Sequence, residues 1–481
     1  MDRVEELYAK FLGYCGKLNS ISRKISFLYI RNLVGDIRFS DKIMKLHELY
    51  YSSLEDQEFV RLLGDLDSLI NAGLLSGVRS RNVLCAKRIF ERNLREPLDL
   101  RLQIEKSKMF GLASYGSGVG LSGCSGQLKE MFKLQMRKAR LLSNGGDCYT
   151  SLVQEYCPDL TRSMLEGLLS DLKQRIKKII CETKCTQSPH ILDRNLQEYL
   201  NSNYFAKNLL DSIGLGPSLK VLVGGRFGSC LYLDRGNVGI VTDRNRGAYL
   251  HVPVLMHEGG HGLFWQNLPR GFTFPHNVCM AMNETSAMFY EQYSFSNQVF
   301  ETINNRVFAD TGTRLRSQHD WINARNYSGA DYYIEVLAVM IVATETEMLL
   351  IDGEIEIEMA NKIMILKMKE MGLFASTPSN YYWLCGLWGY MPAYIVSIIM
   401  STVLYKRAHD EVMLGGGDQL DVLEWMKNNF YCHGHMGVVE FIDTFWNGSF
   451  PVESWEQETR RRITENSQEY RSVSSVAELI A

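Results

Sequence analysis

A short metal-binding pattern, H-E-x-x-H, occupies residues 257–261 and constrains this chain more than any other feature. On a helix, His257 and His261 are four positions apart, so their rings lie on one face, one turn apart. Two imidazole nitrogens at that separation can hold one Zn²⁺ ion. Glu258 stands beside them, where it can take a proton from a water that the metal activates. Apolar residues flank the pattern and predict a buried helix, in which unpaired His and Glu would be costly.

Such a site needs a third protein ligand and a further position left open for water. Apolar spacing over residues 281–289 predicts a second, half-buried helix, and Glu284 on it is the predicted third ligand. Glu291, two turns further on, is placed to orient one histidine. His276 is a weaker alternative for the third position. Another common arrangement places a His six residues after the second one, and Asn267 at that position excludes it.

Composition limits the partners that this chain can have. Of its 481 residues, 46% are hydrophobic and 22% are charged, a globular balance with ample core. The formal net charge of -3 argues against nucleic acid as a main partner. The eleven cysteines are scattered and form no C-x-x-C pair, and the charged start at residues 1–6 lacks an apolar signal core. Both features favour reduced thiols and a cytoplasmic location.

Helical periodicity over most of the chain predicts a mainly α fold of two lobes. Residues 1–217 are predicted as an N-terminal helical lobe and residues 218–481 as a catalytic lobe, which together form one peptidase-like unit. Short β-type runs separated by glycines over residues 219–243 predict a small antiparallel β-sheet beside the metal helix. Its edge could pair with an extended peptide, although a purely structural role fits nearly as well.

The best candidate for a membrane span is residues 371–405, which contain no charged side chain. Pro378, Gly386 and Pro392 interrupt this stretch, and it is rich in Tyr and Trp rather than in aliphatic residues. We therefore expect a buried loop that leads into a core helix, and no contact with a membrane.

Two stretches of this sequence resemble one known family. Residues 257–269 read H-E-G-G-H-G-L-F-W-Q-N-L-P and resemble the metal helix of the carboxypeptidase Taq family of HExxH zinc peptidases, which are gluzincins. Residues 383–394 read W-L-C-G-L-W-G-Y-M-P-A-Y and are similar to that family's tryptophan–glycine–F-G-Y-F-P-T-Y signature. Weaker likenesses extend the match over residues 130–450. The oligopeptidase F and thimet oligopeptidase families share the clan, and the short gap between His261 and Glu284 is closer to theirs.

The resemblance implies a helical zincin-type metallopeptidase with a deep central cleft, the metal at the floor of that cleft, and often a homodimer. It also implies that Tyr390 and Tyr394 reach the site and donate hydrogen bonds to the substrate carbonyl or to its oxyanion. A phenol suits this role, because a neutral donor aimed at developing charge stabilises that charge. The alternative is that both tyrosines only pack there.

Departures from the family pattern bear on specificity. The family has an H-x-x-x-R pattern for the C-terminal carboxylate of the substrate, and the matching positions here are Val339 and Ala343. Asn283 replaces the first His of the family's H-E-S motif, and Tyr382 replaces the His of its Q-D-x-H-W motif. Neither Val nor Ala can hold a carboxylate as Arg does. The sequence therefore leaves open whether the enzyme cleaves at a chain end or within a peptide.

The sequence predicts a zinc-dependent metallopeptidase, or a related amide hydrolase, that acts on a peptide or peptide-like small substrate with Glu258 as general base. Two alternatives stay open. Two His and one carboxylate also suit Fe(II) and other divalent ions, so the same fold could serve a non-hydrolytic tailoring enzyme. A peptide-binding protein with a structural metal is the other alternative, although such a site has no need of Glu258.

Overall fold

Helices make up most of the part of the chain that the structure describes, which confirms the predicted mainly α fold. The computed structural model describes residues 3–33, 40–116, 124–182, 194–216, 220–225, 228–234, 237–243, 248–273, 278–315, 332–373 and 381–464. The elements of the first half are α1 (Arg3–Leu33), α2 (Ser40–Leu54), α3 (Gln57–Asn71), α4 (Gly77–Arg95), α5 (Leu98–Gly116), α6 (Ser125–Ser143), α7 (Cys148–Val153), α8 (Arg162–Glu182), α9 (Arg194–Leu200) and α10 (Asn203–Ser212).

The second half begins with the sheet and continues with helices. Its elements are β1 (Lys220–Gly225), β2 (Ser229–Asp234), β3 (Asn237–Asp243), α11 (Ala248–Gln266), α12 (Met280–Tyr293), α13 (Asn297–Thr311), α15 (Tyr332–Ile351), η4 (Ile357–Met359), α16 (Ala360–Glu370), α17 (Tyr381–Leu384), α18 (Met391–Ala408), η5 (His409–Met413), α19 (Gln419–Asn429), η6 (Tyr431–His433) and α20 (Val438–Trp446). Residues 452–464 form a further helix.

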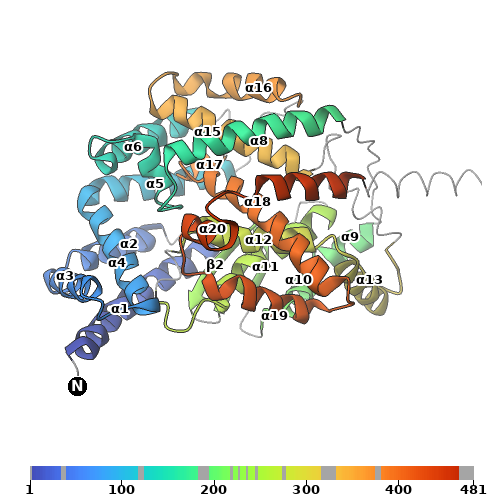
Figure 1. Ribbon diagram of the computed structural model, residues 1–481, viewed down its shortest axis with the longest axis horizontal. Helices are drawn as coiled ribbons and strands as arrows, with labels where there is room; N and C mark the ends of the chain where they lie inside the picture. The colour runs from blue at the N-terminus through green and yellow to red at the C-terminus, as the bar shows by residue number, and fades with distance from the viewer. Residues whose placement is uncertain are drawn as a thin grey trace, which may run out of the picture.

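The outer helices form because apolar residues recur on one face and polar residues cap the ends. In α8 the buried residues are Leu165, Leu168, Leu169, Leu172, Ile176 and Ile179, a single stripe at helical spacing. Asp56 caps α3 by accepting hydrogen bonds from the N–H groups of Glu58 and Phe59. Helices α1 to α4 gather on one side of the molecule (Figure 1), and Phe11, Phe59 and neighbouring apolar residues form a separate small core among them.

The small sheet is mixed, and the predicted antiparallel pairing is correct for one of its two strand pairs. The strand order is β1-β3-β2, with β2 antiparallel and β1 parallel to β3. Because β3 lies between the other two strands, each of them pairs with β3 and not with the other. Val238 and Ile240 of β3 join the main core, whereas Val241 packs with Leu233 on the opposite face. The sheet contacts both α11 and α1.

Helices α11, α12 and α18 lie at the centre of the molecule, and α15 packs on α18 (Figure 1). In α12, every residue from Ala281 to Tyr293 is buried, and α18 is buried along almost its whole length. Helices that are covered on all sides belong in the middle of a large core. The main apolar cluster runs from Leu100 to Ile463, so it includes residues of both predicted lobes. Residue 217, the predicted boundary, lies outside the described residues, and the division into lobes stays a prediction.

The charge-free stretch forms part of this core. It contributes α17 and α18, while residues 374–380 lie outside the described residues. Among the described helices, none combines the length and the apolar character needed to cross a bilayer.

Candidate active site

Glycines on α11 bring its backbone into contact with neighbouring elements. A Cβ atom built on Gly260 would lie 2.6 Å from the carbonyl oxygen of Ser286 and 2.7 Å from the Cα atom of Ala287, both on α12. A Cβ atom on Gly259 would lie 2.6 Å from Leu210 Cδ2 of α10. The Ser286 hydroxyl donates to the Gly260 carbonyl over 2.7 Å. Gly260 is therefore a glycine because a larger side chain would hold α12, and Glu284 with it, too far away, while Gly259 leaves room for the side chains of α10 and the segment after it.

This close approach places His257, His261 and Glu284 together. One potential ligand atom from each lies within 4.8 Å of the others, and all three side chains are almost fully buried. His257 Nε2 is 3.5 Å from Glu284 Oε2, and His261 Nε2 is 3.7 Å from Glu284 Oε1. Tetrahedral coordination at about 2.0–2.2 Å separates ligand atoms by about 3.3–3.6 Å, so this set fits one ion. Among the described residues, no other group of three such side chains converges in this way.

Glu291 contacts His257, as the sequence predicted. Its Oε2 atom lies 2.8 Å from His257 Nδ1, which leaves Nε2 to face Glu284. Burial lowers the pKa of His257, but the hydrogen bond and charge of Glu291, together with Glu284 and Glu258, outweigh it and raise the pKa to about 9. Burial also lowers the pKa of His261, and there Glu284 offsets it only in part. A carboxylate behind a ligating imidazole fixes the orientation of the ring.

Glu258 lies against the start of β2. Its side chain is buried, and a Cβ atom built on Gly228 would be 2.6 Å from Glu258 Oε1 and 2.7 Å from Val254 Cγ1. A larger residue at position 228 would force this carboxylate and the Val254 side chain to shift. Gly228 could not be predicted from the sequence as part of the site, because its contact partners lie on a separate element.

Tyr390 contacts the cluster from the start of α18, and Tyr394 lies beside Tyr390. The hydroxyl of Tyr390 donates a hydrogen bond to Glu284 Oε1, and the two tyrosine rings are 5.2 Å apart. The ring of Tyr156 contacts that of Tyr390 edge-on at 4.8 Å. Burial and the charge of Glu284 raise the pKa of Tyr390 and of Tyr394, so both stay protonated donors. Their predicted role at an oxyanion stays a prediction, and the contact with Glu284 is an additional finding.

A buried carboxyl group that the sequence analysis did not single out anchors the segment before Tyr390. Glu347 on α15 is fully buried and accepts hydrogen bonds from Tyr149 Oη at 2.9 Å, from Trp383 Nε1 at 2.5 Å and from the Gly389 N–H at 3.0 Å. Gly389 has a φ of +76°, and a Cβ atom there would lie 2.7 Å from the backbone of α7. The position of Tyr390 therefore depends on this hydrogen-bonded cluster. An acidic residue within the apolar run of α15 was the available signal, but Glu335 and Glu345 on the same helix share it.

Of the four remaining candidate residues, the structure describes Val339, Ala343 and Tyr382 but not His276. Val339 and Ala343 lie on α15 and pack in the main core. The ring of Tyr382 is 5.9 Å from that of Tyr394, so this residue lies near the site. His276, the alternative third ligand, lies outside the described residues.

Comparisons with known proteins agree with this geometry. Residues 40–441 match the family model described as carboxypeptidase Taq (M32) metallopeptidase. No curated protein matches the sequence. Similar solved structures include Trypanosoma cruzi metallocarboxypeptidase 1, with 18% identity, a TM-score of 0.77, and coverage of 95% of this chain and 99% of that chain. A Pyrococcus furiosus carboxypeptidase has 17% identity, a TM-score of 0.79 and the same coverage. An M32 carboxypeptidase from Deinococcus radiodurans R1 has 14% identity, a TM-score of 0.77, and coverage of 96% and 99%. At these identities, the likeness to solved structures shows a common fold.

Proposed function

Because this chain belongs to the carboxypeptidase Taq (M32) family of metallopeptidases and hydrolyses peptide bonds with a metal, we propose that it holds one Zn²⁺ ion on His257, His261 and Glu284. The observation that supports this proposal most strongly is that one ligand atom from each of the three residues lies within 4.8 Å of the others. Two imidazoles and one carboxylate are a common catalytic zinc set, although other divalent ions accept the same ligands. Elemental analysis of the purified protein identifies the ion, and a content of iron or manganese in place of zinc would contradict this choice.

Glu258 is the proposed general base. A zinc ion bound here would lower the pKa of a water molecule and polarise the scissile carbonyl group. Glu258 follows a ligand directly on α11, so its carboxylate can take the proton from the attacking water and pass it to the leaving amine. Burial beneath Gly228 keeps bulk water away from this carboxylate.

Tyr390 and Tyr394 are the proposed donors to the carbonyl oxygen. Both hydroxyl groups are neutral, and a neutral donor strengthens its hydrogen bond as negative charge develops on its acceptor. Tyr390 already donates to Glu284, so it also orients that carboxylate. Membership in a peptidase family disfavours the two non-hydrolytic alternatives, an iron-dependent tailoring enzyme and a peptide-binding protein with a structural metal.

The proposed substrate is a peptide or peptide-like small molecule. Val339 and Ala343 offer no cation where the resemblance places the carboxylate-binding pattern. We therefore propose that cleavage does not require a free C-terminal carboxylate. Digestion of one peptide with a free and with an amidated C-terminus, followed by mass spectrometry, tests this proposal, and cleavage of the free form alone would refute it.

Replacement of Glu258 by Gln tests the mechanism. The variant keeps the shape of the side chain but loses the base, so zinc content should be unchanged and turnover of a peptide library should fall by at least about a hundredfold. Glu354→Gln, at an exposed position, is the matched control and should keep wild-type activity. A chelator should abolish turnover in both wild type and control. Full activity of Glu258→Gln would end the proposed mechanism.

The cytoplasmic location and the homodimer also stay proposals. The described cysteines are all free thiols, which suits a reducing compartment. Light scattering coupled to size-exclusion chromatography measures the mass in solution, and a single 55.0 kDa species would exclude the dimer.

A further inference from the structure

Two buried cysteines contact each other beside the start of α12. Cys157 is fully buried, and Cys279, the N-cap residue of α12, is 4% exposed. The N–H group of Met280 donates to the Tyr156 carbonyl over 2.8 Å, which holds the two backbone segments side by side. The two thiols are near enough to influence each other's ionisation. Two thiols that belong to distant parts of the sequence are thus direct neighbours.

The two thiols differ in acidity. The interaction with Cys157 and the N–H groups of Met282 and Ala281 at the start of α12 lower the pKa of Cys279, against the opposing effects of burial and Asp159. The interaction with Cys279 and burial raise the pKa of Cys157. A cysteine at a helix N-terminus with a lowered pKa is the more nucleophilic type of thiol. Cys279 is therefore the better nucleophile of the pair.

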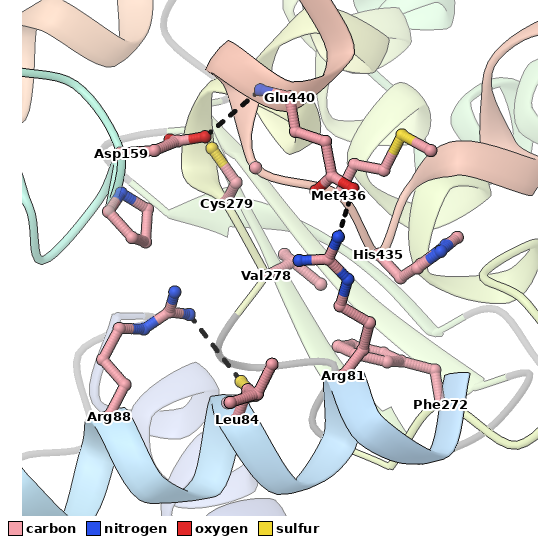
Figure 2. A pocket seen from close by; sticks show the side chains of 13 residues that line it. Arg81, Leu84, Arg88, Asp159, Phe272, Val278, Cys279, His435, Met436 and Glu440 are labelled. Atoms are coloured by element: carbon pink, nitrogen blue, oxygen red, sulfur yellow. Dashed lines mark hydrogen bonds and ion pairs between the residues drawn. The ribbon is translucent and has the colours of Figure 1, made fainter. Parts of the chain in front are cut away.

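Cys279 lines a cavity through which a small oxidant can reach it. The cavity has a volume of about 170 Å³ and lies between α4 and the segments that carry Asp159, Cys279 and His435. Figure 2 shows Arg88 and Leu84 on the α4 side and Cys279 next to Asp159 on the other side. One water molecule takes about 30 Å³ of liquid volume, so a small hydroperoxide fits. Cys85 also lines the cavity, but burial raises the pKa of its thiol.

We propose that Cys157 and Cys279 form a reversible disulfide when the protein meets a small hydroperoxide. The Cys279 thiolate attacks the hydroxyl oxygen of the peroxide, the O–O bond breaks, and a sulfenic acid forms, while the other oxygen leaves as hydroxide or alkoxide and takes up the proton that the Cys279 thiol had lost. The Cys157 thiol then attacks the Cys279 sulfur and gives up its proton, and the sulfenic hydroxyl group leaves as water. The two sulfurs together lose two electrons, which reduce the peroxide.

This disulfide would connect two segments that border the proposed metal site. Glu284 lies on the helix that Cys279 caps, and Tyr156, whose ring contacts Tyr390, precedes Cys157. A disulfide bond is about 2.05 Å long, which is shorter than any contact between unbonded sulfurs, so both side chains would have to move and would fix the two segments relative to each other. A displacement of about 1 Å at a catalytic site can cost up to about a hundredfold in rate. We expect oxidation to reduce turnover by about tenfold and dithiothreitol to restore it.

Mass spectrometry of the full-length protein tests the disulfide independently of its activity. The protein is treated with hydrogen peroxide, alkylated and digested. A cross-linked peptide pair that contains Cys157 and Cys279 is expected, and it should disappear after reduction with dithiothreitol. The Cys157→Ser variant should give no cross-link and should carry Cys279 oxidised beyond the sulfenic acid.

The Cys432→Ser variant removes an exposed thiol and is the matched control, so it should form the same cross-link as wild type. Oxidation confined to Cys432, or a cross-link between other cysteines, would overturn the proposal. A cross-link between Cys157 and Cys279 without loss of turnover would overturn the proposal that this disulfide disturbs the metal site. Because the peptide pair is detected by mass, failure of the proposed peptidase mechanism would leave this part of the test unaffected.

Discussion

Replacing Glu347 by Gln tests whether a buried carboxyl group controls the segment that carries Tyr390. Burial raises the pKa of Glu347 to about 7, although hydrogen bonds from Trp383, Tyr149 and Gly389 lower it. The unfolded chain ionises at the ordinary glutamate pKa of about 4.3. Between these two values the folded protein binds more protons than the unfolded chain. The contribution of Glu347 to stability is therefore fully present below about pH 4.3 and declines as the pH rises to about 7.

The expected magnitudes follow from these values and from the hydrogen bonds. The difference between the two pKa values corresponds to about 4 kcal/mol of free energy of unfolding. Glutamine does not titrate. In either orientation of its amide, the NH₂ group points at a neighbour that donates a hydrogen bond and cannot accept one well, and this mismatch costs about 1–3 kcal/mol of folding stability. We therefore expect Glu347→Gln to be less stable than wild type by at most about that amount at pH 5. By pH 8 the gap should have closed and reversed, because the wild type loses about 4 kcal/mol as the pH rises and the variant loses none.

Calorimetry of the metal-free proteins from pH 5 to pH 8 measures this gap. An unfolding entropy of about 2.1 cal/mol/K per residue gives about 1 kcal/mol/K for the whole chain, so about 3 kcal/mol shifts Tm by about 3 °C. The control is Glu345→Gln on the same helix. Burial raises the pKa of Glu345, but Lys173 and Lys367 outweigh it and lower the pKa overall, so its stabilising contribution is lost as the pH falls. A gap for Glu347→Gln that is independent of pH, or that grows with pH, would refute the reasoning.

Three further substitutions test the construction of the site. Gly260→Ala places a Cβ atom 2.7 Å from a Cα atom of α12, so α11 and α12 must separate; we expect loss of bound metal by elemental analysis and a lower Tm, and wild-type metal content would contradict this. Glu291→Gln weakens the acceptor behind His257 and should reduce metal affinity by about 10–100-fold in a chelator competition, whereas an unchanged affinity would show that the contact is dispensable. Gly228→Ala places a Cβ atom 2.6 Å from Glu258 Oε1, so kcat should fall while metal content stays at the wild-type level; equal loss of both would point to a folding defect instead.

The parts of the site that could be predicted from sequence are those that local geometry fixes. His257 and His261 share a face because of the helical repeat, and the spacing of apolar residues placed Glu284 and Glu291 together on the next helix. The structure brings these four side chains into one cluster.

The parts that could not be predicted depend on contacts between distant segments. Glu347 takes its hydrogen bonds from Tyr149, Trp383 and Gly389, which meet only in the folded chain. The parallel pairing of β1 with β3 is a matter of strand order, which alternating residues do not encode.

The glycines of α11 also bear on how this protein can be produced. Leu210 and Ile213 pack against Gly259, and Leu215 packs against Gly262, so residues just before 217 cover the helix that carries the histidines. A truncated version that begins at 218 would expose this bare strip of backbone to solvent. We expect such a fragment to aggregate when expressed alone, and to become soluble when the missing N-terminal piece is co-expressed in the same cells.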